Sequence, residues 1–71
     1  MNETKKIRLL IPHWIEHNDE HAEEYLRWAE HAGEASPDLL AAVAAVAQVN
    51  RALTAALGKL GGPIEVEKHL D

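Results

Sequence analysis

The stretch Gly33-Glu34-Ala35-Ser36-Pro37-Asp38 separates two helical segments and decides the fold. Gly33 is suited to end the first helix, because glycine readily adopts the left-handed conformation that closes many helices. Ser36, Pro37 and Asp38 are typical of the N-cap and first positions of the next helix. A connection of about four residues is usual in an αα-hairpin. The sequence therefore predicts an all-α fold in which two antiparallel helices meet at this turn.

The predicted helices occupy residues 12–32 and 37–58 of a single domain that covers residues 1–71. Pro12 sets the first boundary, because proline disfavours the helical conformation in the residue before it but is tolerated in a first helical turn. Gly58 and the glycines that follow it stop the second helix. We expect a helical hairpin of two similar lengths.

The two ends of the chain are less regular in sequence. Residues 1–11 are expected to be an N-terminal extension or a short strand, with residues 1–4 disordered. Residues 61–71 are expected to be a C-terminal tail, in which residues 64–71 form a short strand or a docking turn. Both ends leave the hairpin on the same side. An antiparallel pairing of residues 6–10 with residues 64–67 is therefore one predicted arrangement.

Composition excludes several classes of function. A chain of 71 residues without cysteine forms no disulfide, thiolate zinc site or iron–sulfur cluster. The formal net charge of −5 argues against nucleic acid and anionic membrane surfaces, which select clustered Lys and Arg. No apolar run approaches the ~20 residues of a membrane span. We expect a cytoplasmic protein that binds neither nucleic acid nor membrane.

Each helix carries a row of mostly apolar residues in alternating steps of three and four, the spacing of a coiled-coil seam. In the second helix these residues are Leu39, Val43, Val46, Asn50, Leu53, Leu57 and Leu60. In the first helix the same spacing runs through Trp14, Asn18, His21, Tyr25, Trp28 and Ala32, and it extends backward to Ile11 and Ile7. Folding about the turn brings Asn18 level with Asn50, so the two amides can pair within the chain. Each amide can instead pair with its counterpart across an oligomer axis; we favour the intrachain pair.

The second helix is nearly uncharged, since Arg51 is its one charged residue between Leu39 and Leu57. A helix with so little charge is normally buried on all sides, and one partner helix cannot cover it. Carboxylates crowd one side of the first helix, which must face water. We therefore expect a homodimer that buries the alanine-rich surface of the second helix in a four-helix bundle.

Three consecutive H-x-x-E tetrapeptides begin at His13, His17 and His21. On a helix, steps of four residues place these histidines in one slowly drifting row. The row is predicted to enter the core obliquely, with His13 at the rim, His17 at the boundary and His21 inside. Histidines spaced by four residues on one helical face are a metal-ligand pattern.

A metal site would use His17 and His21 as a chelating pair, completed by His13 or Glu24. Neutral imidazoles suit the divalent ions Zn²⁺, Ni²⁺, Co²⁺ and Cu²⁺, and carboxylates are common additional ligands. Two such rows meeting across a dimer would close a four-ligand site. The alternative is structural: histidines followed by glutamates at the third position are ordinary helix-surface pairs.

The repeat also matches H-x-x-E-H, a zinc signature of one class of peptidases. A regular H-x-x-E repeat generates that pattern automatically, and the chain offers no convincing third ligand on another segment. It also contains no nucleophile triad and no glycine-rich phosphate loop. We therefore expect a metal carrier, buffer or sensor, not an enzyme. A structural homodimerisation module without a ligand is the alternative.

The segment from His13 to Ala22 reads H-W-x-x-H-N-x-x-H-A and is followed by Trp28-Ala29. It resembles a segment of small microbial helical proteins of unassigned function, and the similarity covers mainly the first helix. The resemblance implies a helical hairpin and suggests metal binding. It implies no activity.

Overall fold

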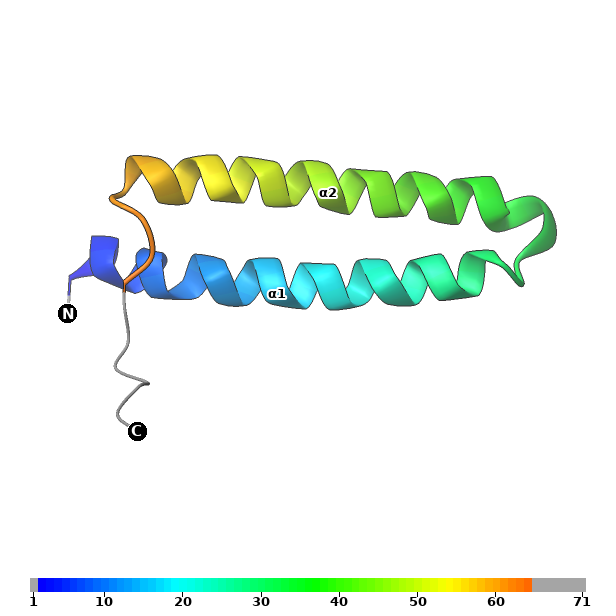
Figure 1. Cartoon of the computed structure of the whole chain (residues 1–71), viewed down its shortest axis with the longest axis horizontal. Coiled ribbons are helices and arrows are strands. Elements are labelled where there is room, and N and C mark those ends of the chain that lie inside the picture. Colours follow the sequence, from blue (N-terminus) through cyan, green and yellow to red (C-terminus); the bar gives the residue numbers. More distant parts are fainter. Residues whose placement is uncertain (1, 65–71) are drawn as a thin grey trace, which may run out of the picture.

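The computed structural model describes residues 2–64, which form a hairpin of two long helices (Figure 1). Helix α1 spans Glu3–Ala29, the short 3-10 helix η1 spans Gly33–Ala35, and helix α2 spans Ser36–Lys59. α1 and α2 lie antiparallel, with the turn at one end of the molecule and residues 2 and 64 at the other. The predicted helical hairpin is confirmed, and α2 agrees closely with the predicted residues 37–58.

α1 begins at Glu3, so the prediction that it starts at Pro12 was wrong. Asn2 caps the helix, because its side-chain oxygen accepts a hydrogen bond from the Lys5 backbone N–H at 2.8 Å. Pro12 lies inside α1 and removes a single backbone hydrogen bond. The cap and the apolar contacts of the preceding turns outweigh that loss.

The expected N-terminal extension or short strand is therefore absent from residues 3–11, which are helical. The expected disorder of residues 1–4 is wrong for Asn2 to Thr4, which cap and begin α1. The proposed strand pairing fails on this side, because residues 6–10 are already hydrogen-bonded within a helix. Its other half and most of the predicted tail, residues 65–71, lie outside the described residues.

The turn differs in detail from its prediction. α1 ends at Ala29, not at residue 32, and Glu30 is its C-cap. Gly33 has the expected positive φ of 58°, but it opens η1 and does not close α1 directly. Ala35 occupies the N-cap position of α2 and makes no side-chain cap, so the expected serine cap at Ser36 was wrong. Pro37 lies in the first turn, as expected.

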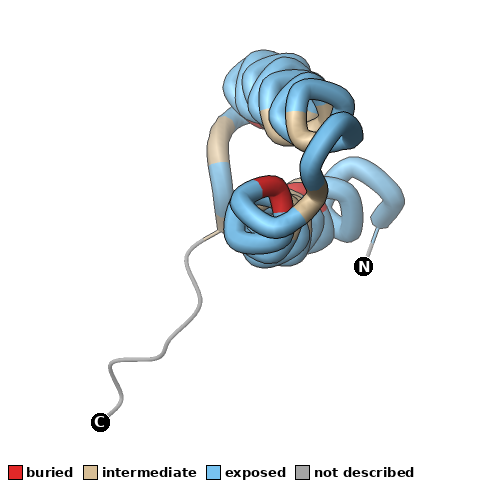
Figure 2. The backbone as a smooth tube through the Cα atoms, turned by 90° about the vertical axis from the view of Figure 1, so that its right-hand side faces the viewer, coloured by how far each residue is buried: buried red, intermediate tan, exposed pale blue. Residues whose placement is uncertain are grey.

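The interior of the hairpin is small. Among residues 2–64 only Ile11, Ala29 and Leu57 are buried, and most of the chain is exposed (Figure 2). From Ile11 to Ala29, the buried and partly exposed residues of α1 are spaced by three and four: Ile11, Ile15, Asn18, Ala22, Tyr25 and Ala29. The predicted seam residues of α2, Leu39, Val43, Val46, Asn50, Leu53 and Leu57, are likewise buried or partly exposed, as is the C-cap Leu60. One helix packed on one other leaves more than half of each helix uncovered.

The predicted seam of α1 was partly wrong. Trp14 is 43% exposed and Trp28 is 58% exposed, and the His21 side chain is 59% exposed. Ile15, Ala22 and Ala29 occupy the positions facing α2 in their place. The face of α1 that packs against α2 is therefore rotated by about 50°, half a residue step, relative to the predicted face.

Arg8 connects α1 to the turn after α2 at the open end of the hairpin. Its Nε donates to the Gly62 carbonyl at 2.6 Å, and its Nη2 donates to the Gly61 carbonyl at 3.2 Å. Both glycines have positive φ, 111° at Gly61 and 84° at Gly62, which turns the chain after α2 back toward α1. A cation at the C-terminal end of a helix is also favoured by the helix dipole.

The segment Gly33–Lys59 is long and apolar enough to cross a membrane by length and composition. The prediction that no apolar run approaches the length of a membrane span was wrong for this segment. The same measure is met by core helices of soluble proteins. Here Leu57 is the one residue of the segment that is buried within the hairpin.

Candidate metal site

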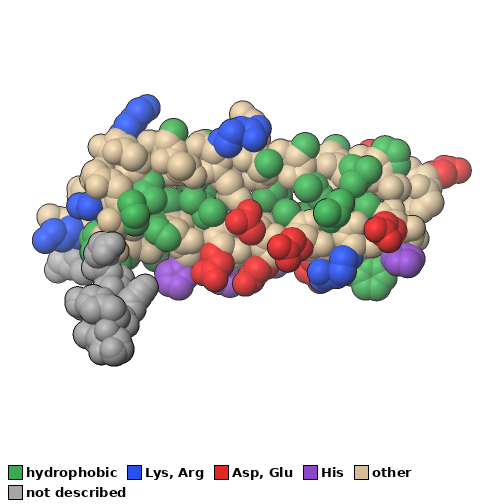
Figure 3. Space-filling model, viewed as in Figure 1, with side chains coloured by type: hydrophobic (Ala, Val, Ile, Leu, Met, Phe, Trp, Pro, Cys, Tyr) green, Lys and Arg blue, Asp and Glu red, His purple; other side chains and the backbone are tan. Residues whose placement is uncertain are grey.

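The histidine row lies on α1, away from α2. His13, His17 and His21 are all exposed, and histidine side chains appear along the α1 edge of the molecule (Figure 3). The predicted gradient from a rim histidine to a buried His21 was wrong. Asn18, Ala22 and Tyr25 face α2, and this places His21 on the flank of the helix.

His21 has two neighbours on its own helix. Its Nδ1 lies 3.9 Å from Glu24 Oε1, and both side chains are more than half exposed. This distance is too long for a hydrogen bond and allows only a weak ion pair when the imidazole is protonated. The ring of His21 also stacks on Tyr25, with centroids 6.3 Å apart and planes inclined by 19°. These contacts restrict the imidazole without enclosing it.

His17 lies one turn before His21, a rise of about 6 Å along α1. Both side chains are exposed on the same side of the helix. Such a pair can chelate one ion from two consecutive turns, as in helical H-x-x-x-H zinc ligands. Glu24 follows His21 on the next turn, and His13 precedes His17 by one turn.

The four predicted ligands do not converge in one copy of the chain. Within residues 2–64 no three histidine or carboxylate side chains come close enough together to hold one ion. Structural zinc sites have four ligands, and catalytic sites have three from the protein. A single hairpin therefore presents a two-histidine half-site, flanked by carboxylates, that is open to solvent.

His31 is separate from this pair. It makes an edge contact with Trp28, with ring centroids 6.0 Å apart and an interplanar angle of 64°. His31 follows His21 by ten residues, which corresponds to about 15 Å along a helix. The two histidines of one chain are therefore too far apart to bind the same ion. His31 is a natural comparison residue for the pair.

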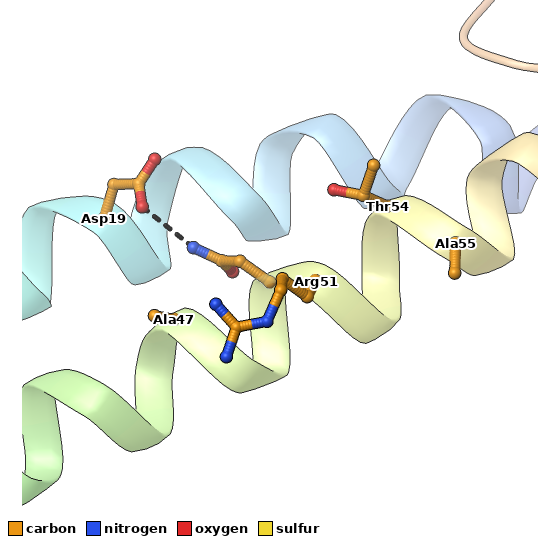
Figure 4. A pocket seen from close by; sticks show the side chains of 6 residues that line it. Asp19, Ala47, Arg51, Thr54 and Ala55 are labelled. Atoms are coloured by element: carbon orange, nitrogen blue, oxygen red, sulfur yellow. Dashed lines mark hydrogen bonds between the residues drawn. The ribbon is translucent and has the colours of Figure 1, made fainter.

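A hydrogen-bonded group of polar side chains lies between α1 and α2, away from the histidine row. Asn18 Nδ2 donates to Asn50 Oδ1 at 3.0 Å, which confirms the predicted intrachain pair. Asn50 Nδ2 donates in turn to Asp19 Oδ1 at 2.8 Å, a contact that the sequence analysis missed (Figure 4). Asp19 and Asn50 line a shallow groove with Ala47, Arg51, Thr54 and Ala55. Their polar atoms satisfy one another, so this group has a structural role.

Arg8 was also missed, because it was counted only as one of few basic residues. Its contacts could have been predicted from the sequence. In an antiparallel hairpin, an arginine near the start of one helix lies level with a Gly-Gly turn after the other helix and can donate to the carbonyl groups there.

Comparison with known proteins gives one family. No curated protein and no solved structure matches the chain. The predicted resemblance to small proteins of unassigned function agrees with the family match, whereas no comparison tests the H-W-x-x-H-N-x-x-H-A segment as a motif. The match covers residues 7–60, which include nearly all of the hairpin, and the chain therefore belongs to the family described as a domain of unknown function, DUF8180.

Proposed function

We propose that this protein binds a divalent transition metal ion, Zn²⁺, Ni²⁺, Co²⁺ or Cu²⁺, through His17 and His21 on α1. The observation that carries the proposal is the exposure of both imidazoles on one side of the helix, one turn apart. Chelation by two side chains of one rigid helix costs little ordering, because the helix already holds both residues. We infer that Glu24, whose Oε1 lies 3.9 Å from His21 Nδ1, orients that imidazole or adds a ligand once a metal ion is bound.

The surroundings favour a cation. Carboxylates of Glu16, Glu20, Glu23 and Glu24 surround the histidine pair on α1, and the chain has a formal net charge of −5. A negative local potential raises the concentration of cations near the pair. The proposed role is a carrier, buffer or sensor for the ion.

The second candidate function is a structural homodimerisation module without a ligand. The observation that favours it is the number of large apolar side chains left exposed by the hairpin. They are Ile7, Leu10, Trp14, Leu26, Trp28, Leu40 and Val49. Only three residues are buried in the described part of the chain, which is little for an independently stable fold of this size. A second copy would supply the missing core.

A lipid bilayer is a less suitable partner for α2 than protein. Gln48, Asn50 and Arg51 lie near the middle of the apolar helix. An arginine at the centre of a membrane span costs about 2.5–3.5 kcal/mol on insertion scales, and the polar neighbours add to it. In a protein dimer Arg51 remains at an accessible edge.

Calorimetric titration of the four metals into the purified protein tests the proposal. The wild type is expected to bind at least one of them saturably, and a His17→Ala/His21→Ala variant is expected to lose that binding. A His31→Ala variant is the matched control, because it removes one exposed imidazole elsewhere on the chain. Equal binding by the wild type and the double variant would refute the metal proposal and leave the dimerisation module.

A further inference from the structure

α1 carries a second row of residues beside the row that packs against α2. Its apolar members are Ile7, Leu10, Trp14 and Trp28, which are 38%, 38%, 43% and 58% exposed. His17, His21 and Glu24 continue the same alternating steps of three and four between the two tryptophans. This is the spacing of a coiled-coil seam, and within residues 2–64 the hairpin leaves its apolar members partly exposed. We call these seven residues the outer seam.

We propose that a second copy of this chain packs antiparallel on the outer seam and completes the metal site. The inference rests on the proposed function, and it names the partner and the surface. Antiparallel packing centred near residue 19 brings Leu10 opposite Trp28 of the partner subunit. It also brings His17 opposite His21 of the partner subunit. Apolar residues then meet at both ends, and imidazoles meet in the middle.

Charge selects the antiparallel direction. In a parallel pair, Glu24 would face Glu24 of the partner subunit across the seam, and like charges at such positions repel. In the antiparallel pair, Glu24 lies beside Trp14 and His17 of the partner subunit instead. A histidine there can accept a metal or a proton and so complement the carboxylate. The exposed carboxylates of Glu16, Glu20 and Glu23 stay outside the contact.

The ligand count points the same way. One copy offers no group of three ligands within residues 2–64. Two antiparallel copies offer four imidazoles, from His17 and His21 of each chain, at the centre of one interface. Four nitrogen ligands in a tetrahedral arrangement suit Zn²⁺ or Co²⁺. The site is therefore incomplete without the second copy.

The exposed area is consistent with a dimer contact. Trp14 and Trp28 together expose roughly 200 Å² per chain, given their exposed fractions and the size of the side chain. This is about a quarter of the ~800 Å² that each partner buries in a standard interface. On α2, Val49 is 49% exposed, and it lies on the opposite side of that helix from Ala47, which lines the groove with Asp19. Val49 therefore extends the apolar surface on the side of the outer seam.

Distances between spin labels test the direction of packing. The chain has no cysteine, so Lys5→Cys and Glu30→Cys each introduce a single labelling site on an exposed residue outside the outer seam. Antiparallel packing about residue 19 predicts axial separations of about 42 Å between labels at residue 5 and about 33 Å at residue 30. Parallel packing would make both distances short, and that result would overturn the inference.

A matched pair of variants tests the surface. Trp28→Glu is expected to convert the dimer to a monomer by light scattering and to weaken metal binding at least tenfold, although His17 and His21 remain. Leu26→Glu is the control: Leu26 is 49% exposed but lies on the opposite flank of α1, where it lines a second groove with Asp19 and Ala47, so mass and metal binding should not change. Circular dichroism checks that both variants keep their helices.

The outcomes separate the two proposals. A wild-type monomer that still binds metal through His17 and His21 would overturn this inference and leave the proposed function standing. An antiparallel dimer that binds none of the four metals would refute the proposed function and the completed site. A protein that forms no dimer but floats with neutral phosphatidylcholine vesicles would use the outer seam to bind lipid. That result would overturn the inference.

Discussion

Asn18 and Asn50 join the two helices midway along the hairpin, with Asn18 Nδ2 donating to Asn50 Oδ1 at 3.0 Å. Asn50 also donates to Asp19 at 2.8 Å, so one amide serves two partners on α1. We predict that Asn50→Ala lowers the free energy of unfolding by about 1–2 kcal/mol, because both partners lose a hydrogen bond. Urea denaturation followed by circular dichroism at fixed protein concentration measures the change.

Two further variants sharpen that prediction. Gln48→Ala alters an exposed residue of α2 that bonds only to Arg51, so it should change stability by less than about 0.5 kcal/mol. An Asn18→Leu/Asn50→Leu protein should be destabilised less than Asn50→Ala, because apolar replacement of both amides leaves neither amide of the pair unsatisfied. Equal stability of Asn50→Ala and the wild type would contradict a structural role for this pair.

Arg8 holds the turn after α2 against the first turns of α1 through two carbonyl contacts. Arg8→Ala is expected to cost about 1–2 kcal/mol, since hydrogen bonds from a charged donor are stronger than neutral ones. The loss should be local, with faster amide hydrogen exchange at Leu60 and Gly62, whose N–H groups close the end of α2. Lys6→Ala, an exposed neighbour with the same charge, should leave that exchange unchanged.

Pro12 interrupts the hydrogen bonds of α1 in its interior. Proline costs about 3 kcal/mol relative to alanine in a helix interior, and Pro12 is exposed, so no packing depends on its ring. Pro12→Ala should therefore raise the free energy of unfolding by about 1–3 kcal/mol. A thermal or urea transition at lower temperature or denaturant than the wild type would show that the ring has a packing role of its own.

Particular residues show how far the sequence determines this fold. The turn from Gly33 to Asp38 and the seam of α2 were predictable, because glycine, proline and regularly spaced leucines act locally. Asn18 and Asn50 were predictable as partners because a short turn fixes the register of a hairpin.

The phase of α1 was not predictable by the same means. The row of α1 that packs against α2 includes Ala22 and Ala29, which are small and give a weak hydrophobic signal in the sequence. Trp14 and Trp28 give a strong signal but lie on the outer seam. The apparent seam therefore followed the tryptophans and placed His21 in the core. The start of α1 was missed because the rule for residues before proline was weighted above the cap at Asn2.

Native mass spectrometry of the wild type with Zn²⁺ or Ni²⁺ tests the central claim most directly, beside the His17→Ala/His21→Ala variant. The account predicts a species of two 7.9 kDa chains with one metal ion, and the loss of that ion in the variant. Wild-type protein without metal, or the same number of ions on both proteins, would contradict a metal site at His17 and His21.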